Sequence, residues 1–440
     1  MTETASTTPD TTPSTTTAAT TDAGQSVEEF SAQAAAWLAE NGERRTNVAT
    51  DEVTWGEGDF SVSVFHNMSH EVEQGHLEQL RAWNHKKAEQ RYHAITWPEK
   101  YGGLGLSRAH ARAFGALERD YVVPDSHELF SVTVGLMAPT VRAFGTDEQK
   151  GRFISDFLRT DSFCCQLFSE PGAGSDLAAL GCRAERDGDE WIVNGQKVWS
   201  SGAQFADCGL LISRSDPDQP KHKGMTAFMV PFDTPGVDVR PIKQMSGGTS
   251  FNEVFFSDAR IPDSLRIGDV GEGWKVALTT LGFERDHSSS GGSAGRRPGG
   301  SWKQILATAQ ALGVLDDPII RESLMQLYVH LQTERHLNRR AADLARDGTP
   351  GPEGSLGKLK WTEGMRKMSD TVSTVLGPRL IADTGEWGMF AWGEHVLGAP
   401  GYRIAGGSDE VQRNIIGERV LGLPGEPRVD KNIAWKEIPK

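Results

Sequence analysis

The sequence predicts an α+β protein of several domains, with helices at both ends and a β domain between them. The chain has 440 residues, which exceeds one small domain and is typical of two or three structural units. Apolar residues recur with a helical period before residue 160 and after residue 266, while short β-branched and aromatic runs fill the stretch between them. No helical pattern alternates with these runs, so a parallel nucleotide-binding sheet is not expected.

The domain boundaries follow these changes in pattern. Residues 1–25 are rich in Thr, Ala, Ser and Pro and have too few apolar side chains to form a core, so we expect them to be disordered. The remaining segments are an N-terminal helical domain at 26–160, a β domain at 161–265, a C-terminal helical domain at 266–425 and a tail at 426–440.

The N-terminal domain is predicted from helical periodicity. Its first helix begins after Ser26 and ends at Gly42, and the apolar residues between them share one face. Those residues are Val27, Phe30, Ala34, Trp37 and Leu38. Further helices are expected at about 72–90 and 108–144.

Turn signals divide the rest of the chain. The β domain contains the runs EWIVNGQKVW, GLLISRSD and TAFMVPF, and the Asn194-Gly195 pair within the first predicts a hairpin turn. The helical pattern that follows GEGWK is broken at Ser288–Ser301 and again at Arg346–Ser355.

The composition argues against several functions. The net charge of −14 is unlike that of a general nucleic-acid binder. The absence of an apolar run of about eighteen residues argues against a membrane span. The four cysteines include no CxxC pair, so neither a disulfide framework nor a zinc site is expected. The N-terminal tail lacks the pattern of a secretory or mitochondrial signal, and we expect a cytoplasmic protein.

A loop rich in small residues starts the β domain, in the segment CQLFSEPGAGSDLAAL. Pro171, Gly172 and Gly174 predict a tight turn that a ligand can approach closely, and Ser169 and Ser175 supply hydroxyl groups. Taken alone, the segment is more typical of an ordinary turn than of a binding site. It is not a phosphate-binding P-loop, because no Gly-Lys-Ser/Thr follows.

Two other segments are candidates for binding. Trp199 precedes Ser200 and Ser201, and a tryptophan beside hydroxyl groups can stack on a flat ring while they bond its edge; a core tryptophan on a strand is the simpler alternative. Ile404–Val420, IAGGSDEVQRNIIGERV, is typical of a helix N-terminus, which suits an anion.

Together these motifs resemble the acyl-CoA dehydrogenase family. The segments WPEKYGG, EPGAGSD, NGQKVW, GEGWKVA and SDEVQRNIIGERVLGLP occur in the family's order and near its spacings, over roughly residues 70–425. The resemblance implies a helical domain, a β-barrel-like middle domain and a C-terminal four-helix bundle. It also implies an FAD enzyme that desaturates an acyl-CoA thioester, as in fatty acid β-oxidation, and passes electrons to an electron-transfer flavoprotein. The expected assembly is a dimer or tetramer of identical or related chains.

The resemblance assigns roles around the flavin ring. Trp199 would pack against the ring with Ser201 near its reactive N5 edge, and Ser169 would bond its pyrimidine end. The positions that would line the flavin are Gln166, Phe168, Ser169, Gly174 and Ser175.

Other matching positions lie later in the chain. Ser408 and Glu410 would lie by the ADP half of FAD, so the anion at this helix would be a diphosphate. Leu376-Gly377 would correspond to a flavin-contacting loop usually supplied by a neighbouring subunit. Ser175 would also lie along the path of the acyl-CoA.

The catalytic base is not where many family members carry it. That place, before a Gly-Thr pair, is Gly406 here, which would still offer a backbone N–H to the thioester carbonyl. In isovaleryl- and long-chain-type members the base precedes an arginine on a helix, and Glu284 and Arg285 match in GEGWKVALTTLGFERDH. Glu284 is therefore the predicted base, with Arg285, Gly406 and Gly407 at the substrate. A frayed helix end with two solvated charges is the alternative.

One family segment has no counterpart here. Many members carry an Arg-x-x-Phe-Gly segment whose arginine reaches the FAD diphosphate of a neighbouring subunit, and only Arg296 or Arg297 offers a substitute. A non-catalytic or half-catalytic partner subunit therefore stays open as an alternative, although retention of Glu284 argues against it. A flavin-dependent oxidase or monooxygenase on the same fold is a further alternative.

Overall fold

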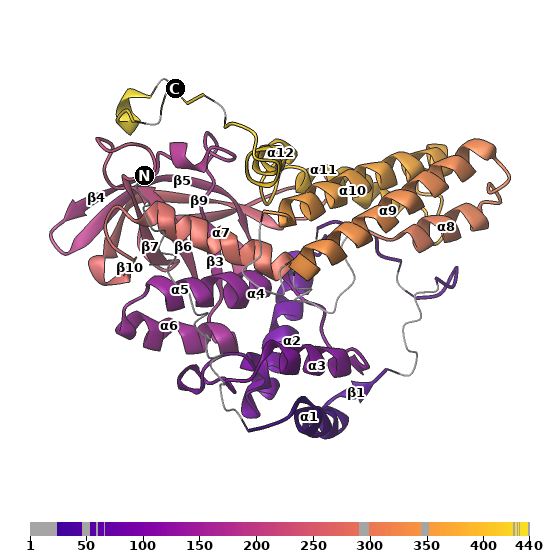
Figure 1. The fold of residues 1–440 in the computed structure, drawn as a ribbon, viewed down its shortest axis with the longest axis horizontal. Helices are drawn as coiled ribbons and strands as arrows, with labels where there is room; N and C mark the ends of the chain where they lie inside the picture. The colour runs from indigo at the N-terminus through magenta and orange to yellow at the C-terminus, as the bar shows by residue number, and fades with distance from the viewer. Residues whose placement is uncertain are drawn as a thin grey trace, which may run out of the picture.

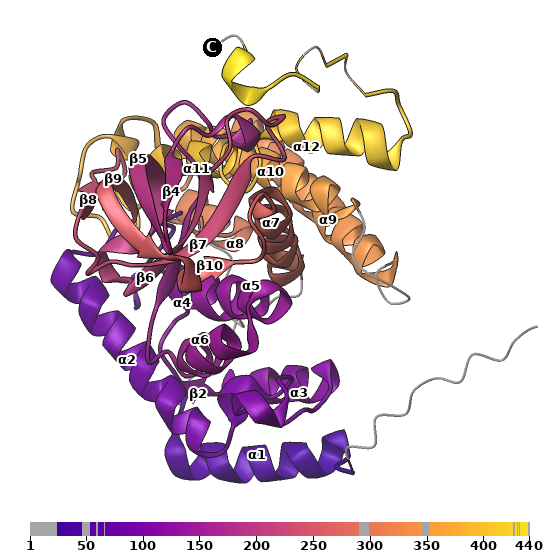
Figure 2. The same ribbon diagram turned by 90° about the vertical axis from the view of Figure 1, so that its left-hand side faces the viewer.

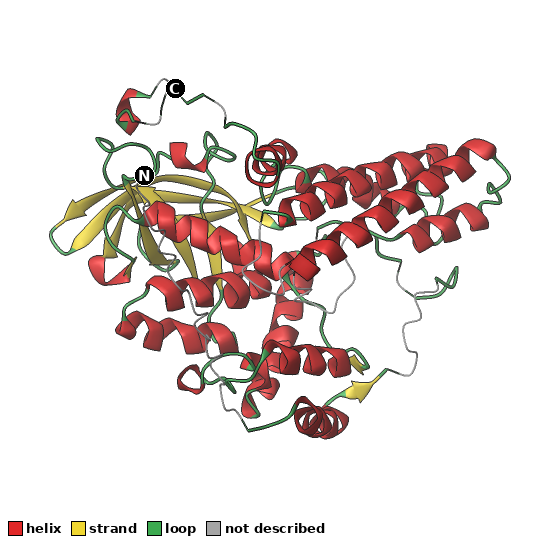
Figure 3. Ribbon diagram, viewed as in Figure 1, coloured by secondary structure: helices red, strands yellow, loops and turns green. Residues whose placement is uncertain are grey.

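In the computed structural model, helices precede and follow a mostly antiparallel sheet (Figure 1), which confirms the predicted fold class. Figure 3 separates the helical and strand regions by colour. The structure describes residues 24–45, 53–58, 60–65, 67–289, 299–344, 352–425, 427–428, 430 and 432–438, without the side chains of 284–289 and 342. Nearly all of the tail predicted to be disordered lies outside these residues.

The first helices begin and end where local signals place them. Ser26 caps α1 (Val27–Asn41) in a capping box with Glu29, and Gly42 follows the last turn, as predicted. The helix expected at 72–90 is α2 (His70–Glu89), which is capped by Ser69.

The segment predicted as helix from 108 to 144 is divided. It forms α3 (Arg108–Glu118), α4 (Glu128–Val132), a π-helical turn (Thr133–Met137) and α5 (Ala138–Phe144), and α6 (Asp147–Arg159) follows. Pro124 lacks an N–H and disfavours helical backbone in the residue before it, which keeps α3 and α4 apart. Between them β2 (Tyr121–Val122) pairs with β1 (Glu43–Arg44).

The middle domain is an eight-stranded sheet in the order β10-β7-β6-β4-β5-β9-β8, with β3 paired to β6. Its strands are β3 (Cys164–Leu167), β4 (Arg183–Asp187), β5 (Glu190–Ser201), β6 (Cys208–Arg214), β7 (Met225–Pro231), β8 (Val237–Ile242), β9 (Phe251–Pro262) and β10 (Arg266–Ile267). β6 is buried along its whole length, which explains its nearly continuous apolar sequence.

The predicted hairpin turn at Asn194-Gly195 is wrong. Both residues lie inside β5, where the pairing with β9 shifts register at a bulge, and the turn between β4 and β5 lies instead at Gly188. Packing decides this, because a Cβ on Gly195 would lie 2.7 Å from the Cα of Cys182. Asn194 is bound across the bulge by two 2.9 Å hydrogen bonds with Asp258.

The C-terminal helices form two groups. α7 (Gly273–Ser289) lies beside α5 and against the sheet (Figure 2), and its Val276 and Ala277 belong to the same core as the β domain. The helices of the second group extend away from the sheet as a bundle (Figure 1) and are α8 (Trp302–Ala311), α9 (Pro318–Leu344), α10 (Gly354–Leu376) and α11 (Trp392–Tyr402). Trp392 is fully buried in the separate core of this bundle, and Val62 of the N-terminal part packs there too. α12 (Asp409–Ile415) continues as a π-helical turn to Val420.

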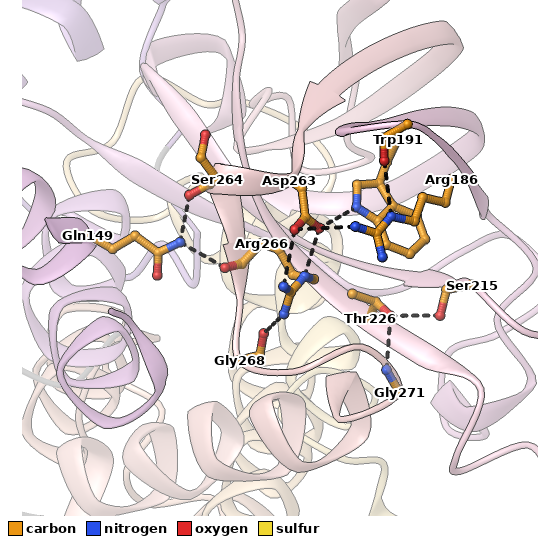
Figure 4. A network of polar contacts seen from close by, with 11 residues as sticks. Gln149, Arg186, Trp191, Ser215, Thr226, Asp263, Ser264, Arg266, Gly268 and Gly271 are labelled. Atoms are coloured by element: carbon orange, nitrogen blue, oxygen red, sulfur yellow. Dashed lines mark hydrogen bonds and ion pairs between the residues drawn. The ribbon is translucent and has the colours of Figure 1, made fainter. Parts of the chain in front are cut away.

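A polar network fixes the connection between the sheet and α7 (Figure 4). The carboxylate of Asp263 accepts hydrogen bonds from Arg266 at 2.9 and 3.2 Å and from the indole of Trp191 at 2.7 Å. The amide of Gln149 on α6 donates to the carbonyls of Ser264 and Arg266, both at 2.8 Å. These bonds hold the β10 turn against α6, and α7 starts seven residues after Arg266.

Residue 430 and residues 432–438 form a strap that returns to the β domain. Ala434 forms a β-bridge with Pro220, and the indole of Trp435 donates to the carbonyl of Ala179 at 3.2 Å. The guanidinium group of Arg214 lies 4.9 Å from the centre of the Trp435 ring. The strap thus covers loops made more than 200 residues earlier in the chain.

Candidate active site

A tight turn closes the loop that follows β3. Glu170 and Ala173 exchange two backbone hydrogen bonds of 3.0 Å, and the proline and glycine of the motif lie between them. A Cβ added at Gly172 or Gly174 would meet no atom within 4 Å, and Ser175 is exposed. The loop therefore presents bare backbone to open space, and the predicted tight turn is present.

A buried ion pair holds this loop from inside. Lys197 on β5 has no solvent exposure, and its ammonium group donates to the carbonyl of Phe168 at 3.0 Å and to Glu170 at 2.7 Å. The Glu170 carboxylate also accepts the backbone N–H groups of Gly181 and Cys182 at 2.7 and 2.9 Å. A desolvated charge pair is stable only with such additional hydrogen bonds, so the two residues fix both ends of the loop.

The strap holds the outer side of the same loop. The ammonium group of Lys221 lies 3.0 Å from Asp176, which follows Ser175, and 2.5 Å from Asp430 of the strap. The loop is consequently tied both to the sheet beneath it and to the strap above it.

Two buried polar atoms near the loop lack a protein partner. The side-chain nitrogen of Gln166 on β3 and the hydroxyl of Ser200 on β5 have no hydrogen bond to any part of the chain that the structure describes. Buried polar atoms are nearly always satisfied, so each is a place for a ligand group or an ordered water. Ser169 is half-buried, and its carbonyl accepts the N–H of Val198 at 2.9 Å.

Trp199 is exposed and held in an unusual backbone conformation. Its φ of 63° is in the left-handed region that bulky residues avoid, and 58% of the residue is open to solvent. Its ring meets Phe251 edge to face at 5.9 Å. The core alternative for this tryptophan is therefore wrong, and strain of this kind is found at binding sites.

Ser201, two residues further along β5, contacts a carboxylate from another domain. Its hydroxyl donates to Oε1 of Glu128, the first residue of α4, at 2.9 Å. Burial raises the pKa of Glu128. The preceding residue, His127, pairs with Glu73 of α2 at 2.9 Å, and both side chains are only 2% exposed.

A series of aromatic rings connects Trp199 with the C-terminal helices. Phe251 meets Phe65 at 5.2 Å between ring centres, and Phe65 stacks on Tyr402 at 5.0 Å. Tyr402 ends α11, and Gly406-Gly407, the glycine segment, follows four residues later, before α12. The structure thus brings the β-domain motifs and the Gly406 segment to one region.

The glycine segment needs glycine at both positions. Gly406 and Gly407 have φ values of 63° and 83°, which residues with a side chain rarely adopt. The Ser408 hydroxyl caps α12 by accepting the N–H of Val411 at 3.3 Å, while Glu410 is exposed. The hydroxyl that the resemblance places by the ADP half of FAD is thus engaged with its own helix.

A buried carboxylate anchors this segment to α10. Asp409 is 1% exposed and accepts hydrogen bonds from Thr362 and Arg403, both at 2.8 Å. Lys358 donates to the carbonyl of Gly407 at 2.7 Å. The start of α10 therefore fixes the backbone of the glycine segment.

Leu376 and Gly377 lie at the other end of α10. Leu376 comes fourteen residues after Thr362, which at 1.5 Å per residue places it about 20 Å further along the helix. The Leu376-Gly377 turn is therefore remote from the glycine segment of the same chain.

The predicted base lies on α7, which continues through Glu284 and Arg285, but the side chains of both lie outside the described residues. Position 284 comes one turn after Thr280, which is fully buried and meets Thr140 of α5 at 3.0 Å. Arg296 and Arg297 also lie outside the described residues.

Three features of this region were not predicted: the pairing of Lys197 with Glu170, the contact of Ser201 with Glu128, and the strap. The one local signal of the first is that Lys197 lies within a predicted strand, directly before Val198 and Trp199, since burial of an unpaired charge is unfavourable. The other two join residues at least 73 apart, and no local pattern marks them.

Comparison with known proteins supports one family throughout. Models of the acyl-CoA dehydrogenase N-terminal, middle and C-terminal domains match residues 59–161, 165–259 and 271–421. Acyl-CoA dehydrogenase IpdE1 of Mycobacterium tuberculosis is 38% identical over 405 residues, which are 92% of this chain and 100% of that protein.

Solved structures agree with the sequence comparison. A structure titled Tcur3481-Tcur3483 steroid ACAD matches with a TM-score of 0.68 and 27% identity, over 91% of this chain and 98% of that one. The ChsE4-ChsE5 complex from Mycobacterium tuberculosis matches with a TM-score of 0.64 and 25% identity, over 91% and 98%. Within the described ranges, no helix of this chain is long and apolar enough to cross a membrane. The exposed, strained Trp199, the loop after β3 and the three matching domains lead to one conclusion: this chain belongs to the acyl-CoA dehydrogenase family.

Proposed function

We propose that this protein is an FAD-dependent acyl-CoA dehydrogenase that introduces an α,β double bond into an acyl-CoA thioester. The observation that carries the proposal is Trp199, a large aromatic residue that is 58% exposed on a strained backbone near Ser201. A flat, hydrogen-bonding cofactor would cover that ring. Members of the family are FAD-dependent oxidoreductases, which supports the same cofactor.

The residues around the loop fit such a cofactor. The side-chain nitrogen of Gln166 and the hydroxyl of Ser200 are buried donors awaiting a partner, and the backbone at Gly172 and Gly174 is open to close approach. We assign the flavin ring to Trp199 and the loop of Phe168, Ser169, Gly174 and Ser175, with its reactive edge at Ser201. The ADP half is assigned to Ser408 and Glu410, and Leu376-Gly377 to the site of a neighbouring subunit.

The chemistry needs a base and a polarised carbonyl. FAD, when bound, supplies the acceptor for the β-hydrogen, which leaves the substrate as hydride. Glu284 on α7 removes the α-proton, while the backbone N–H of Gly406 donates to the thioester carbonyl and stabilises the charge that develops on its oxygen. Arg285 and Gly407 border the substrate, and Ser175 lies along its path. A base in a dry pocket is strengthened because burial raises the pKa of a carboxyl group.

The electron acceptor and the assembly follow the same proposal. The reduced enzyme passes its electrons to an electron-transfer flavoprotein. The site is completed by a second chain, identical or related, and the ChsE4-ChsE5 complex supports a related chain because it joins two different proteins.

A steroid-derived acyl-CoA is the second candidate substrate class beside a simple fatty acyl-CoA. It is favoured by the likeness to a structure titled as a steroid ACAD, which is 27% identical over nearly the whole chain. The test is anaerobic titration of the FAD-loaded protein with straight-chain, branched and steroid side-chain acyl-CoA thioesters. Bleaching of the flavin absorption by one of these classes identifies the substrate.

Two outcomes would contradict the proposal. A protein that takes up no FAD on reconstitution would exclude a flavoenzyme. Rapid oxygen consumption by the reduced protein, in place of electron transfer to the flavoprotein, would favour an oxidase or monooxygenase.

A further inference from the structure

Glu128 is a carboxylate close to the proposed flavin that the chemistry above does not use. It begins α4, and its Oε1 accepts the Ser201 hydroxyl at 2.9 Å across the boundary between the helical and β domains. The side chain is half-buried, and no other hydrogen-bond donor to its carboxylate is seen in the described part of the chain. Glu128 therefore controls what the Ser201 hydroxyl can do on its other side.

Glu128 exerts this control because the protonation of its carboxyl group decides whether Ser201 donates to it or accepts from it. A serine hydroxyl has one proton to donate and lone pairs to accept with. While Glu128 is ionised, Ser201 gives its proton to Glu128 and can only accept a hydrogen bond from a ligand. Once Glu128 is protonated, it can donate to Ser201, whose own proton is then free for the ligand.

We propose that Glu128 is a positioning residue that sets the direction of the Ser201 hydrogen bond and so couples its own proton to the redox state of the bound flavin. The proposal rests on the proposed function, which puts the flavin edge at Ser201. An oxidised flavin nitrogen at that edge accepts a hydrogen bond, which matches protonated Glu128. A reduced flavin carries a hydrogen there and donates, which matches ionised Glu128.

The exchange is balanced. Two electrons and one hydrogen reach the flavin as hydride from the substrate, and the O–H bond of Glu128 releases one proton to solvent as the hydrogen bond reverses. No other oxidant or reductant takes part.

The surroundings allow this carboxyl group to hold a proton. Burial raises its pKa, the hydrogen bond from Ser201 and the charge of His127 lower it, and Glu73 raises it. His127, the N-cap of α4, and Glu73 of α2 are the titratable groups that face Glu128, and they are paired with each other at 2.9 Å. His76 of α2 lies beyond them, with 6.3 Å between its ring centre and that of His127.

The test measures the midpoint potential of the bound flavin against pH, from about pH 5 to about pH 9, which spans the range above the ordinary pKa of Glu. In the wild type we expect a pH range, called the window below, in which the midpoint potential falls less steeply with pH than it does outside that range. The two slopes differ by one proton, which is a factor of ten in the equilibrium constant per pH unit, or about 30 mV per pH unit for a two-electron couple. Glu128→Gln removes the titrating proton and should abolish the window. Ser201→Ala keeps Glu128 but breaks its connection and should abolish it too.

Glu253→Gln is the matched control. Glu253 on β9 also accepts one side-chain hydrogen bond from β5, from Gln196 at 2.8 Å, so the same chemical change is made on the same sheet. This variant should keep the window.

A wild-type curve without the window, or a Glu128→Gln curve that retains it, would overturn the coupling. If Glu128→Gln does not fold or hold FAD, the wild-type and Ser201→Ala curves decide. A wild-type protein that binds no FAD would instead overturn the proposed function, and this coupling with it.

Discussion

The ammonium group of Lys197, which has no solvent exposure, lies 2.7 Å from the carboxylate of Glu170 at the base of the loop that ends at Ser175. The pair joins the centre of β5 to the turn after β3. A charge buried in this way has no alternative partner in water, so the ion pair fixes the start of the loop to the sheet.

Removal of one charge of the Lys197–Glu170 pair should therefore destabilise the folded protein. We expect Lys197→Met to lower the free energy of unfolding by about 3–5 kcal/mol, because Glu170 would be left buried and unpaired. Urea unfolding measures the change. Lys275→Met is the control, since Lys275 pairs with Glu272 on the surface at 3.2 Å and should contribute less than about 1 kcal/mol. Equal effects of the two substitutions would show that the buried pair has no special role.

Acid should weaken the connection between the sheet and α7. The hydrogen bond from Arg266 first of all lowers the pKa of Asp263 from 3.8 to about 2. Because its pKa is lowered, the ionised carboxylate of Asp263 stabilises the fold at pH values above the ordinary pKa of Asp. This stability is lost as the pH falls from about 4 to about 2. Asp263→Asn should lower the free energy of unfolding by about 1–2 kcal/mol at neutral pH, with a difference from wild type that shrinks below about pH 4. Urea unfolding over a pH series measures this difference.

Asp238→Asn supplies the comparison, because Asp238 pairs with Arg240 on the exposed strand β8. A constant difference between wild type and Asp263→Asn at all pH values would contradict the assignment.

Removal of the proposed base should stop the reaction but not cofactor binding. We expect Glu284→Gln to lower the rate of flavin reduction by substrate by several orders of magnitude while FAD stays bound, since the amide keeps the shape and cannot accept the proton. Anaerobic stopped-flow absorption in a single turnover measures the rate.

Glu272→Gln, the same chemical change just before α7, should leave that rate nearly unchanged. Reduction of Glu284→Gln at the wild-type rate would move the partner-subunit and oxygen-using alternatives ahead.

The surface of the C-terminal domain predicts assembly. Ile381, Ile404 and Leu421 are 84, 72 and 66% exposed, and we propose that a second chain covers them. We expect light scattering to give a dimer or tetramer, of one chain or with a related chain, and Ile381→Asp to shift it towards the monomer. A wild-type monomer that holds FAD and turns over would contradict this.

The sequence predicts those parts of the fold that depend on neighbours along the chain. Ser26 and Glu29 cap α1, and Gly42 ends it, so both limits of the helix are determined by residues within it or next to it. The succession of helices, strands and helices is likewise visible in periodicity. The turn after Glu170 was predicted because proline and glycine restrict the backbone locally.

The features that could not be predicted from the sequence depend on packing between segments that are distant along the chain. Asn194-Gly195 has the local signature of a turn, but Gly195 fits against Cys182 inside a continuous strand. Glu128 and Ser201 are 73 residues apart, and neither is marked by its own neighbours. For Trp199 the sequence left open whether it is a core or a binding residue, and its exposure and backbone conformation separate the two.

The strap sets an order of events during synthesis. The carbonyl of Ala179 receives its hydrogen bond from Trp435, which leaves the ribosome 256 residues later. Until then Arg214 lacks the ring that covers it, and Lys221 lacks one of its two carboxylates. The β domain can complete its sheet early, whereas the loop that carries Ser175 waits for nearly the whole polypeptide. In a nascent chain this loop would thus lack its contacts with the strap until Trp435 has been synthesised.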